Sequence, residues 1–193
     1  MGASVSTSDA STTTALGFLT VLDHPQHGLF GGYLILNTAG RPLEFHCTAP
    51  IKPNRAQQIL YGPTLEAFLY GEQIGQTLLA QAKNPPLLVC TDRRPALVVR
   101  EHVPVPVALV LPAESEPPPD QDEKLLRLDA AHNGGPKLVI FQLGRNRLAV
   151  GERSEGDRGL ITERLAELAE SFDLAEPFGR IREAIEEAQQ AVR

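Results

Sequence analysis

LGFLTVLDHPQHGLFGGYLIL, residues 16–36, is the stretch that decides how the fold begins. Two apolar runs, residues 16–22 and 29–36, flank a loop that contains Pro and Gly, which is typical of two neighbouring strands. Residues 37–40 form a tight-turn sequence before a third run at 43–48. Because connections this short join antiparallel neighbours, we expect a three-stranded meander.

Polar and apolar residues alternate in the third run. Leu43, Phe45 and Cys47 share one face, and the side chains between them share the other. This alternation predicts that Cys47 points into the core and that the face bearing Glu44 and His46 is the polar one.

Helical sequences follow the meander. Asn54 is placed to cap a short helix over residues 55–61, and a second, well-buried helix is expected from residue 63 to about residue 79. Strands are then predicted at 87–90 and 96–100, joined as a hairpin by a turn at 92–95, with another strand possible at 105–111. The order of a meander, two helices and a hairpin on a largely antiparallel sheet predicts an α+β fold, similar in element order alone to profilin-like or roadblock-like proteins.

The sequence divides into five segments. Residues 1–14 form a Ser/Thr-rich leader expected to be disordered, residues 15–111 form the core domain, and residues 112–124 form an acidic, Pro-rich linker or loop. Residues 125–150 contain short strands that either extend the first sheet or form their own. Residues 151–193 contain two amphipathic helices, a C-terminal arm whose apolar positions are Ile161, Leu165, Leu168, Phe172, Phe178, Ile181 and Ile185.

Charge is unevenly distributed along the chain of 193 residues, whose net charge is −6. Residues 1–111 carry seven basic and seven acidic side chains, and residues 112–193 carry eleven and seventeen. Neither half has the positive excess that phosphate binding needs, so a nucleic-acid partner is not favoured. No apolar run is long enough to span a membrane and no secretory signal opens the chain, so a cytoplasmic location is expected. No cofactor is indicated.

Histidine and cysteine supply the candidate metal ligands and nucleophiles. His24, His27 and His46 are weak candidates for metal ligands. His46 and Cys47 are adjacent on one strand and therefore point to opposite faces, so only one of them could join a given site. Cys47 and Cys90 both lie within predicted strands, which favours packed thiols over catalytic ones.

A family resemblance rests on four short motifs: Gly31-Gly32-Tyr33-Leu34-Ile35-Leu36, Gly40-Arg41, Pro53-Asn54-Arg55 and Cys90-Thr91-Asp92. Together they resemble the ribonuclease H pattern of three strands, a helix and a strand that ends in Asp. The resemblance implies a metal-dependent phosphodiester hydrolase in which Asp23 and Asp92 would supply two of the acidic positions. Gln57 would stand at the helical acidic position, so an inactive relative is the form of this family that the sequence favours.

The sequence leaves two functional hypotheses. The first is a non-enzymatic binding, regulatory or adaptor module that acts through protein–protein contacts, with the C-terminal arm mediating partner binding or self-association. The alternative is a metal-dependent hydrolase or degenerate ribonuclease H-like protein using Asp23 and Asp92.

Overall fold

The computed structural model describes residues 14–112 and 137–190. The expected leader lies outside the described residues except for residue 14, as does nearly all of the expected linker, and the strand expected near 125–128 is outside them too. In the described ranges no helix is long and apolar enough to cross a bilayer.

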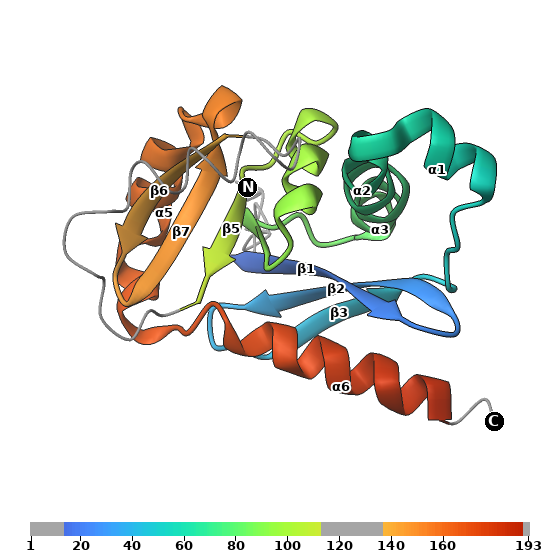
Figure 1. Cartoon of the computed structure of the whole chain (residues 1–193). Helices are drawn as coiled ribbons and strands as arrows, with labels where there is room; N and C mark the ends of the chain where they lie inside the picture. The colour runs from blue at the N-terminus through green and yellow to red at the C-terminus, as the bar shows by residue number, and fades with distance from the viewer. Residues whose placement is uncertain (1–13, 113–136, 191–193) are drawn as a thin grey trace, which may run out of the picture.

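Seven strands form one mixed sheet in the order β3-β2-β1-β4-β5-β7-β6 (Figure 1). The predicted meander is present, because β2 pairs antiparallel with both β1 and β3. In contrast, β4 is parallel to β1 and to β5, and β6 and β7 extend this same sheet beside β5. The strand bounds are β1 Ala15–His24, β2 Gly28–Asn37, β3 Pro42–Cys47, β4 Leu88–Thr91, β5 Val107–Leu111, β6 Leu138–Leu143 and β7 Asn146–Gly151.

The α+β class is confirmed, whereas the profilin-like or roadblock-like element order is not. The hairpin expected after β4 is absent, because residues Arg94–Glu101 form the 3-10 helix η3. Pro95 occupies the first turn of η3, where a missing N–H costs nothing, and Ala96, Leu97 and Val99 are buried. The chain therefore crosses over the sheet face and enters β5 parallel to β4.

Helices from the middle of the chain cover one face of the sheet (Figure 1). They are α1 Arg55–Tyr61, η1 Gly62–Thr64, α2 Leu65–Ala67, the π-helical η2 Phe68–Gln76 and α3 Thr77–Gln81. Asn54 caps α1 as predicted, since its side chain accepts a hydrogen bond from the Gln57 backbone and the Gln57 side chain accepts one from the Asn54 backbone. Leu69, Ile74 and Leu78 pack on this face with Leu19 and Tyr33.

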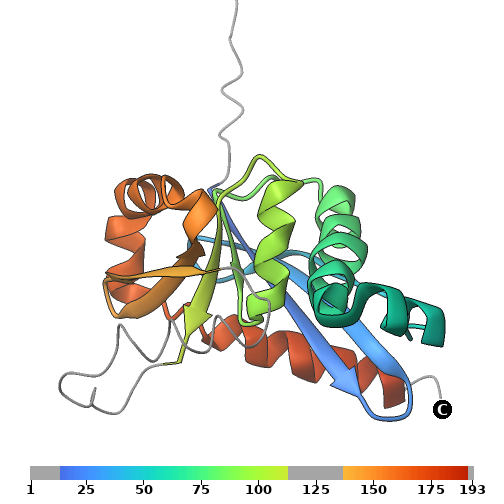
Figure 2. The same ribbon diagram turned by 45° about the horizontal axis from the view of Figure 1, so that its top comes forward.

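The C-terminal helices cover the opposite face, as Figure 2 also shows. They are α5 Asp157–Ser171 and α6 Glu176–Gln190, preceded by the short η4 Glu152–Ser154. The apolar stripe of α6 is buried in the chain's own core through Phe178, Ile181 and Ile185. Gly32 on β2 allows this contact, because a Cβ there would lie 2.3 Å from Ile181 Cγ2. The two helices are therefore integral to the domain, and α6 runs along β1 and β2 toward the tip of their hairpin (Figure 2).

Cys47 is exposed, so the prediction that it points into the core is wrong. It pairs with Gly32 on the face that α6 covers, but β3 is the outer strand of the sheet and α6 leaves Leu43 and Phe45 about two-fifths exposed as well. Cys90 is fully buried in the central strand β4, and burial raises the pKa of its thiol.

Candidate functional site

Asp92 lies immediately after β4, at the point where the sheet order changes direction. The chain runs from β1 outward through β2 and β3 on one side, and β4 and β5 lie on the other side of β1. β4 is parallel to β1 and ends beside its middle, because Leu19 pairs with Thr91 and β1 continues to His24. Crevices at such switch points are the usual ligand sites of open sheets with parallel strands.

Two side chains from distant parts of the chain, and that of the neighbouring Arg93, lie around Asp92. The Thr20 hydroxyl, buried in the middle of β1, donates to Asp92 Oδ1 at 2.6 Å. The Arg182 guanidinium of α6 donates to Asp92 Oδ2. Arg93 Nε lies 3.9 Å from Asp92 Oδ1, beyond hydrogen-bond distance. This group of four residues is called the Asp92 cluster below.

The Asp92 cluster carries more positive than negative charge. Arg93 and Arg182 are about two-fifths exposed, whereas the Asp92 side chain is 16% exposed. The Nε atom of Arg93 is buried and has no hydrogen-bond partner. Two guanidinium groups thus face one carboxylate, and they keep enough exposure for a further anion to reach them.

Asp23 does not join Asp92. Asp23 follows Leu19 and Val21 in the alternation of β1, and both of these face the helices η2 and α3. Thr20 faces α6. Leu19 pairs with Thr91 of β4, so Asp92 follows beside Thr20, whose hydroxyl bonds it. Three residues of strand, about 10 Å, also separate Thr20 from Asp23. The two carboxylates that the ribonuclease H resemblance implies therefore lie on opposite faces of the sheet.

Gln57 does not complete an acidic set either, because it lies on the exposed α1 and its side chain is used in the helix cap. In residues 14–112 and 137–190 no group of three His, Cys, Asp or Glu side chains is placed to hold a metal ion. Within these ranges the residues do not fit the two-metal arrangement of that family.

His24 and His27 are brought together at the tip of the β1–β2 hairpin, with ring centroids 4.6 Å apart. They line a pocket of about 680 Å³ together with Cys47 and the last turns of α6.

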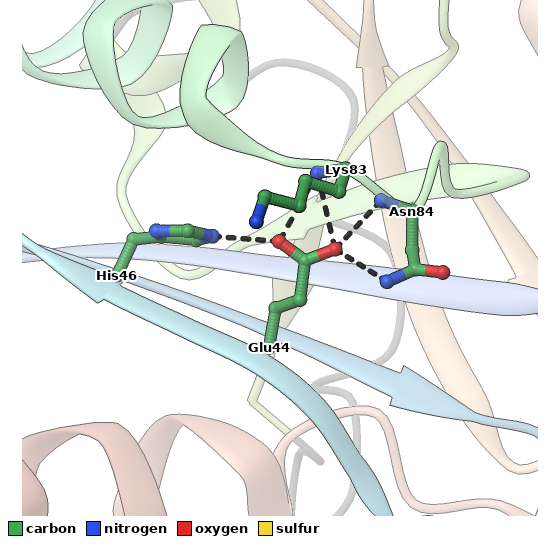
Figure 3. Close-up of polar contacts among 4 residues, drawn as sticks. All are labelled: Glu44, His46, Lys83 and Asn84. Atoms are coloured by element: carbon green, nitrogen blue, oxygen red, sulfur yellow. Dashed lines mark hydrogen bonds and ion pairs between the residues drawn. The ribbon is translucent and has the colours of Figure 1, made fainter.

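His46 belongs to a different cluster, on the face covered by α3 (Figure 3). Its Nε2 lies 2.8 Å from Glu44 Oε2, and the Glu44 carboxylate also accepts hydrogen bonds from the backbone N–H groups of Lys83 and Asn84. Burial raises the pKa of Glu44, but these hydrogen bonds and one from the Asn84 side chain outweigh it and lower the pKa to about 2. Glu44 thereby fastens the chain between α3 and β4 to the outer strand β3. This arrangement is a structural anchor.

Sequence reasoning missed Thr20, Arg93 and Arg182. One signal was available for Thr20, the single hydroxyl in the apolar run of residues 16–22. Arg182 lies among the charged residues on the exposed side of α6 and carries no local signal of its role. Its partner is 90 residues away, so only the tertiary structure reveals the pair.

Comparison with known proteins gives structural neighbours only. No family model matches the chain, and no curated protein matches it. A crystal structure of human ENDOV is 14% identical, with a TM-score of 0.43, over 93% of this chain and 87% of that one. A Ciona intestinalis endonuclease V variant bound to a 23mer DNA containing an inosine is 11% identical, with a TM-score of 0.39, over 72% and 70%. A second Ciona intestinalis endonuclease V complex, with a 24mer DNA, has a TM-score of 0.36.

Two expectations drawn from the sequence stand against these findings. The first is the adaptor acting through protein contacts, since the neighbours are endonuclease V structures, and the second is that nucleic acid is not favoured, since two of them were solved with DNA. The structure supplies a physical reason for each error. The apolar stripe taken for a docking surface is buried in the chain's own core, and the net charge of −6 conceals the local excess of guanidinium groups at Asp92.

Proposed function

We propose that this chain is a nucleic-acid-binding protein of degenerate ribonuclease H-like topology, with its contact site at the carboxyl end of β4, beside the middle of β1. The observation that carries the proposal is the Asp92 cluster, in which Arg182 and Arg93 flank a single carboxylate at the switch point of the sheet. A cytoplasmic location remains part of the proposal.

The strand arrangement supports the first half of the proposal. Three antiparallel strands, a helical segment and a fourth strand followed by Asp92 are the elements of the ribonuclease H pattern named above. In this chain β4 returns beside β1 and parallel to it. That pairing places the end of β4 in the middle of the sheet, where a ligand can reach Asp92 beside the middle of β1.

The chemistry of the Asp92 cluster supports binding of phosphate. A guanidinium group offers several N–H donors in a planar fork that matches a phosphate group, and it stays charged at every physiological pH. The carboxylate holds Arg182 in place between α6 and β4. A phosphodiester that reaches this site would contact the Arg182 guanidinium, which the fold already holds in place.

Metal-dependent hydrolysis is the second candidate, and the placement of Asp92 at the end of β4 is the observation that favours it. Two features weigh against it. The Asp92 carboxylate is already bonded to Thr20 and Arg182, and Asp23 lies on the other face of the sheet.

One experiment separates the two candidates. Purified protein is mixed with labelled single-stranded and duplex oligonucleotides in the presence of Mg²⁺, Mn²⁺ or EDTA, and both binding and cleavage are followed. The proposal expects binding that persists in EDTA, with no cleavage under any condition. Metal-dependent cleavage that is lost in Asp92→Asn would contradict the proposal and would show that the protein is a metal-dependent hydrolase.

A further inference from the structure

The pocket at the end of α6 lies between the tip of the β1–β2 hairpin, the end of β3 and the last turns of the helix. Its volume of about 680 Å³ is in the range of small-molecule sites. Figure 1 shows the end of α6 beside this hairpin tip. The Asp92 cluster does not use any residue that lines the pocket, so the pocket is a separate part of the same sheet face.

One wall of the pocket is aromatic. The rings of His24 and His27 are tilted by 38° to each other, and both approach Phe30 edge-on at centroid distances of 6.4 and 6.5 Å. His24 Nδ1 accepts from the backbone N–H groups of Gln26 and His27, which fixes the orientation of its ring. A fixed aromatic wall is a platform on which a planar heterocycle stacks.

Polar groups stand on α6 across from that wall. Glu186 and Gln189 line the pocket, and between them they offer oxygen acceptors and an amide donor. Among the described residues that line the pocket, Glu186 is the only Asp, Glu, Lys or Arg, so none of them offers a cationic side chain of Lys or Arg to an anionic group. The chemistry suits a neutral planar ring with hydrogen-bonding edges.

The pocket and the Asp92 cluster are both in contact with α6, one helical turn apart. Arg182 and Glu186 are four residues apart on the same helix, a rise of about 6 Å, and Gln189 lies about 4 Å further on. We propose that the pocket takes a nucleobase of a single strand whose phosphate contacts Arg182. This inference rests on the proposed function and adds the part of the nucleic acid that is recognised. A base stacked inside a duplex cannot enter, so the site selects unpaired strands.

Cys47 makes the inference testable in the unmodified protein. Cys47 is exposed and lines the pocket, whereas Cys90 is fully buried, so a thiol-alkylating reagent reports on the pocket alone. The alkylation rate of Cys47 is measured with a single-stranded oligonucleotide and with an abasic oligonucleotide of the same length. At about ten times the Kd of each, the natural strand is expected to slow alkylation about tenfold, and the abasic strand to leave the rate unchanged.

A pair of variants provides an independent readout. His27→Ala is expected to weaken binding of the natural strand and to leave binding of the abasic strand as it was. The matched control is His102→Ala, at an exposed histidine that does not line the pocket.

The outcomes distinguish this inference from the proposed function. Binding of the natural strand without protection of Cys47, or equal protection by the abasic strand, overturns the base pocket and leaves nucleic-acid binding standing. If neither strand binds, both proposals fail.

Discussion

Arg182 of α6 is ion-paired with Asp92 at the end of β4, across 90 residues of sequence. The pair fastens the C-terminal helix to the switch point of the sheet, beside the Thr20 hydroxyl that bonds the other carboxylate oxygen. The same carboxylate competes with any phosphate for the guanidinium group. Asp92 therefore both positions Arg182 and limits the positive charge of the site.

Asp92→Asn is expected to strengthen oligonucleotide binding, because it removes the negative charge that neutralises Arg182 and keeps a side chain of the same shape. The gain should be about tenfold at low salt, the order of magnitude of a charge removed next to a phosphate contact. Fluorescence anisotropy with a labelled single strand measures it. Glu163→Gln, at an exposed position of α5, removes the same charge and should have little effect. Weaker binding by Asp92→Asn would contradict the assigned role.

Glu44→Gln is expected to destabilise the fold by about 2 kcal/mol at pH 7, because the carboxylate accepts hydrogen bonds from His46, Lys83 and Asn84. The pKa of Glu44 falls from its ordinary 4.5 to about 2 on folding, so its contribution is complete above pH 4.5 and is lost as the pH drops toward 2. Urea unfolding at several pH values should show that the difference in the free energy of unfolding between the unmodified protein and Glu44→Gln decreases as the pH falls from 4.5 to 2. A difference in the free energy of unfolding that stays constant down to about pH 2.5 would show that the charge of Glu44 does not stabilise the fold.

Gly32→Ala and Gly179→Ala are expected to change stability in opposite directions. A Cβ at Gly32 would lie 2.3 Å from Ile181 Cγ2 and 2.8 Å from Ile185 Cδ1, and overpacking of this kind costs about 1–3 kcal/mol. A Cβ at Gly179, within α6, meets nothing within 4 Å, so alanine there should stabilise the helix by about 1 kcal/mol. Denaturant unfolding measures both. Equal changes in the free energy of unfolding would mean that α6 does not pack closely against β2 at Gly32.

Asp157→Ala is expected to cost about 3 kcal/mol, because it leaves the Arg100 guanidinium without its carboxylate in a largely buried setting. Asp157 is 5% exposed, and Arg100 also donates to the Val103 carbonyl. The exposed pair of Arg153 and Glu101 is the matched comparison, since Glu101→Ala should cost well under 1 kcal/mol. Thermal unfolding of the two variants compares a buried and an exposed ion pair in one protein. Similar losses of stability in the two variants would contradict the stronger role given to the pair of Arg100 and Asp157.

Local patterns in the sequence predict much of the fold. The meander, the Asn54 cap and the two C-terminal helices each follow from contacts between residues close in sequence, which periodicity and turn chemistry report directly. The segment 96–100 shows the limit of this approach. A short apolar run suits a buried strand and a buried helical turn equally well, and Pro95 at its start was the one feature that favoured the helix.

The candidate site was only partly predictable because its members meet through tertiary structure. His24 and His27 are close in sequence and are close in space. Asp23 and Asp92 both follow apolar runs, but strand alternation places Asp23 on the face opposite Thr20, which a count along β1 could have shown. Nothing local marks Arg182 as the partner of Asp92, since the pairing depends on how α6 lies across the sheet.

The most direct test of nucleic-acid binding at the Asp92 cluster is the affinity of the protein and of Arg182→Ala for a labelled single strand, measured from about 50 to 200 mM salt. We predict that the unmodified protein binds, that Arg182→Ala binds more weakly, and that the slope of log K against log salt becomes shallower by about 0.7, the loss of one phosphate contact. Arg182→Lys should keep the salt slope. Arg164→Ala, on the exposed side of α5, should change neither the affinity nor the salt slope. No binding by the unmodified protein at the lowest salt, or an unchanged slope in Arg182→Ala, would contradict this account.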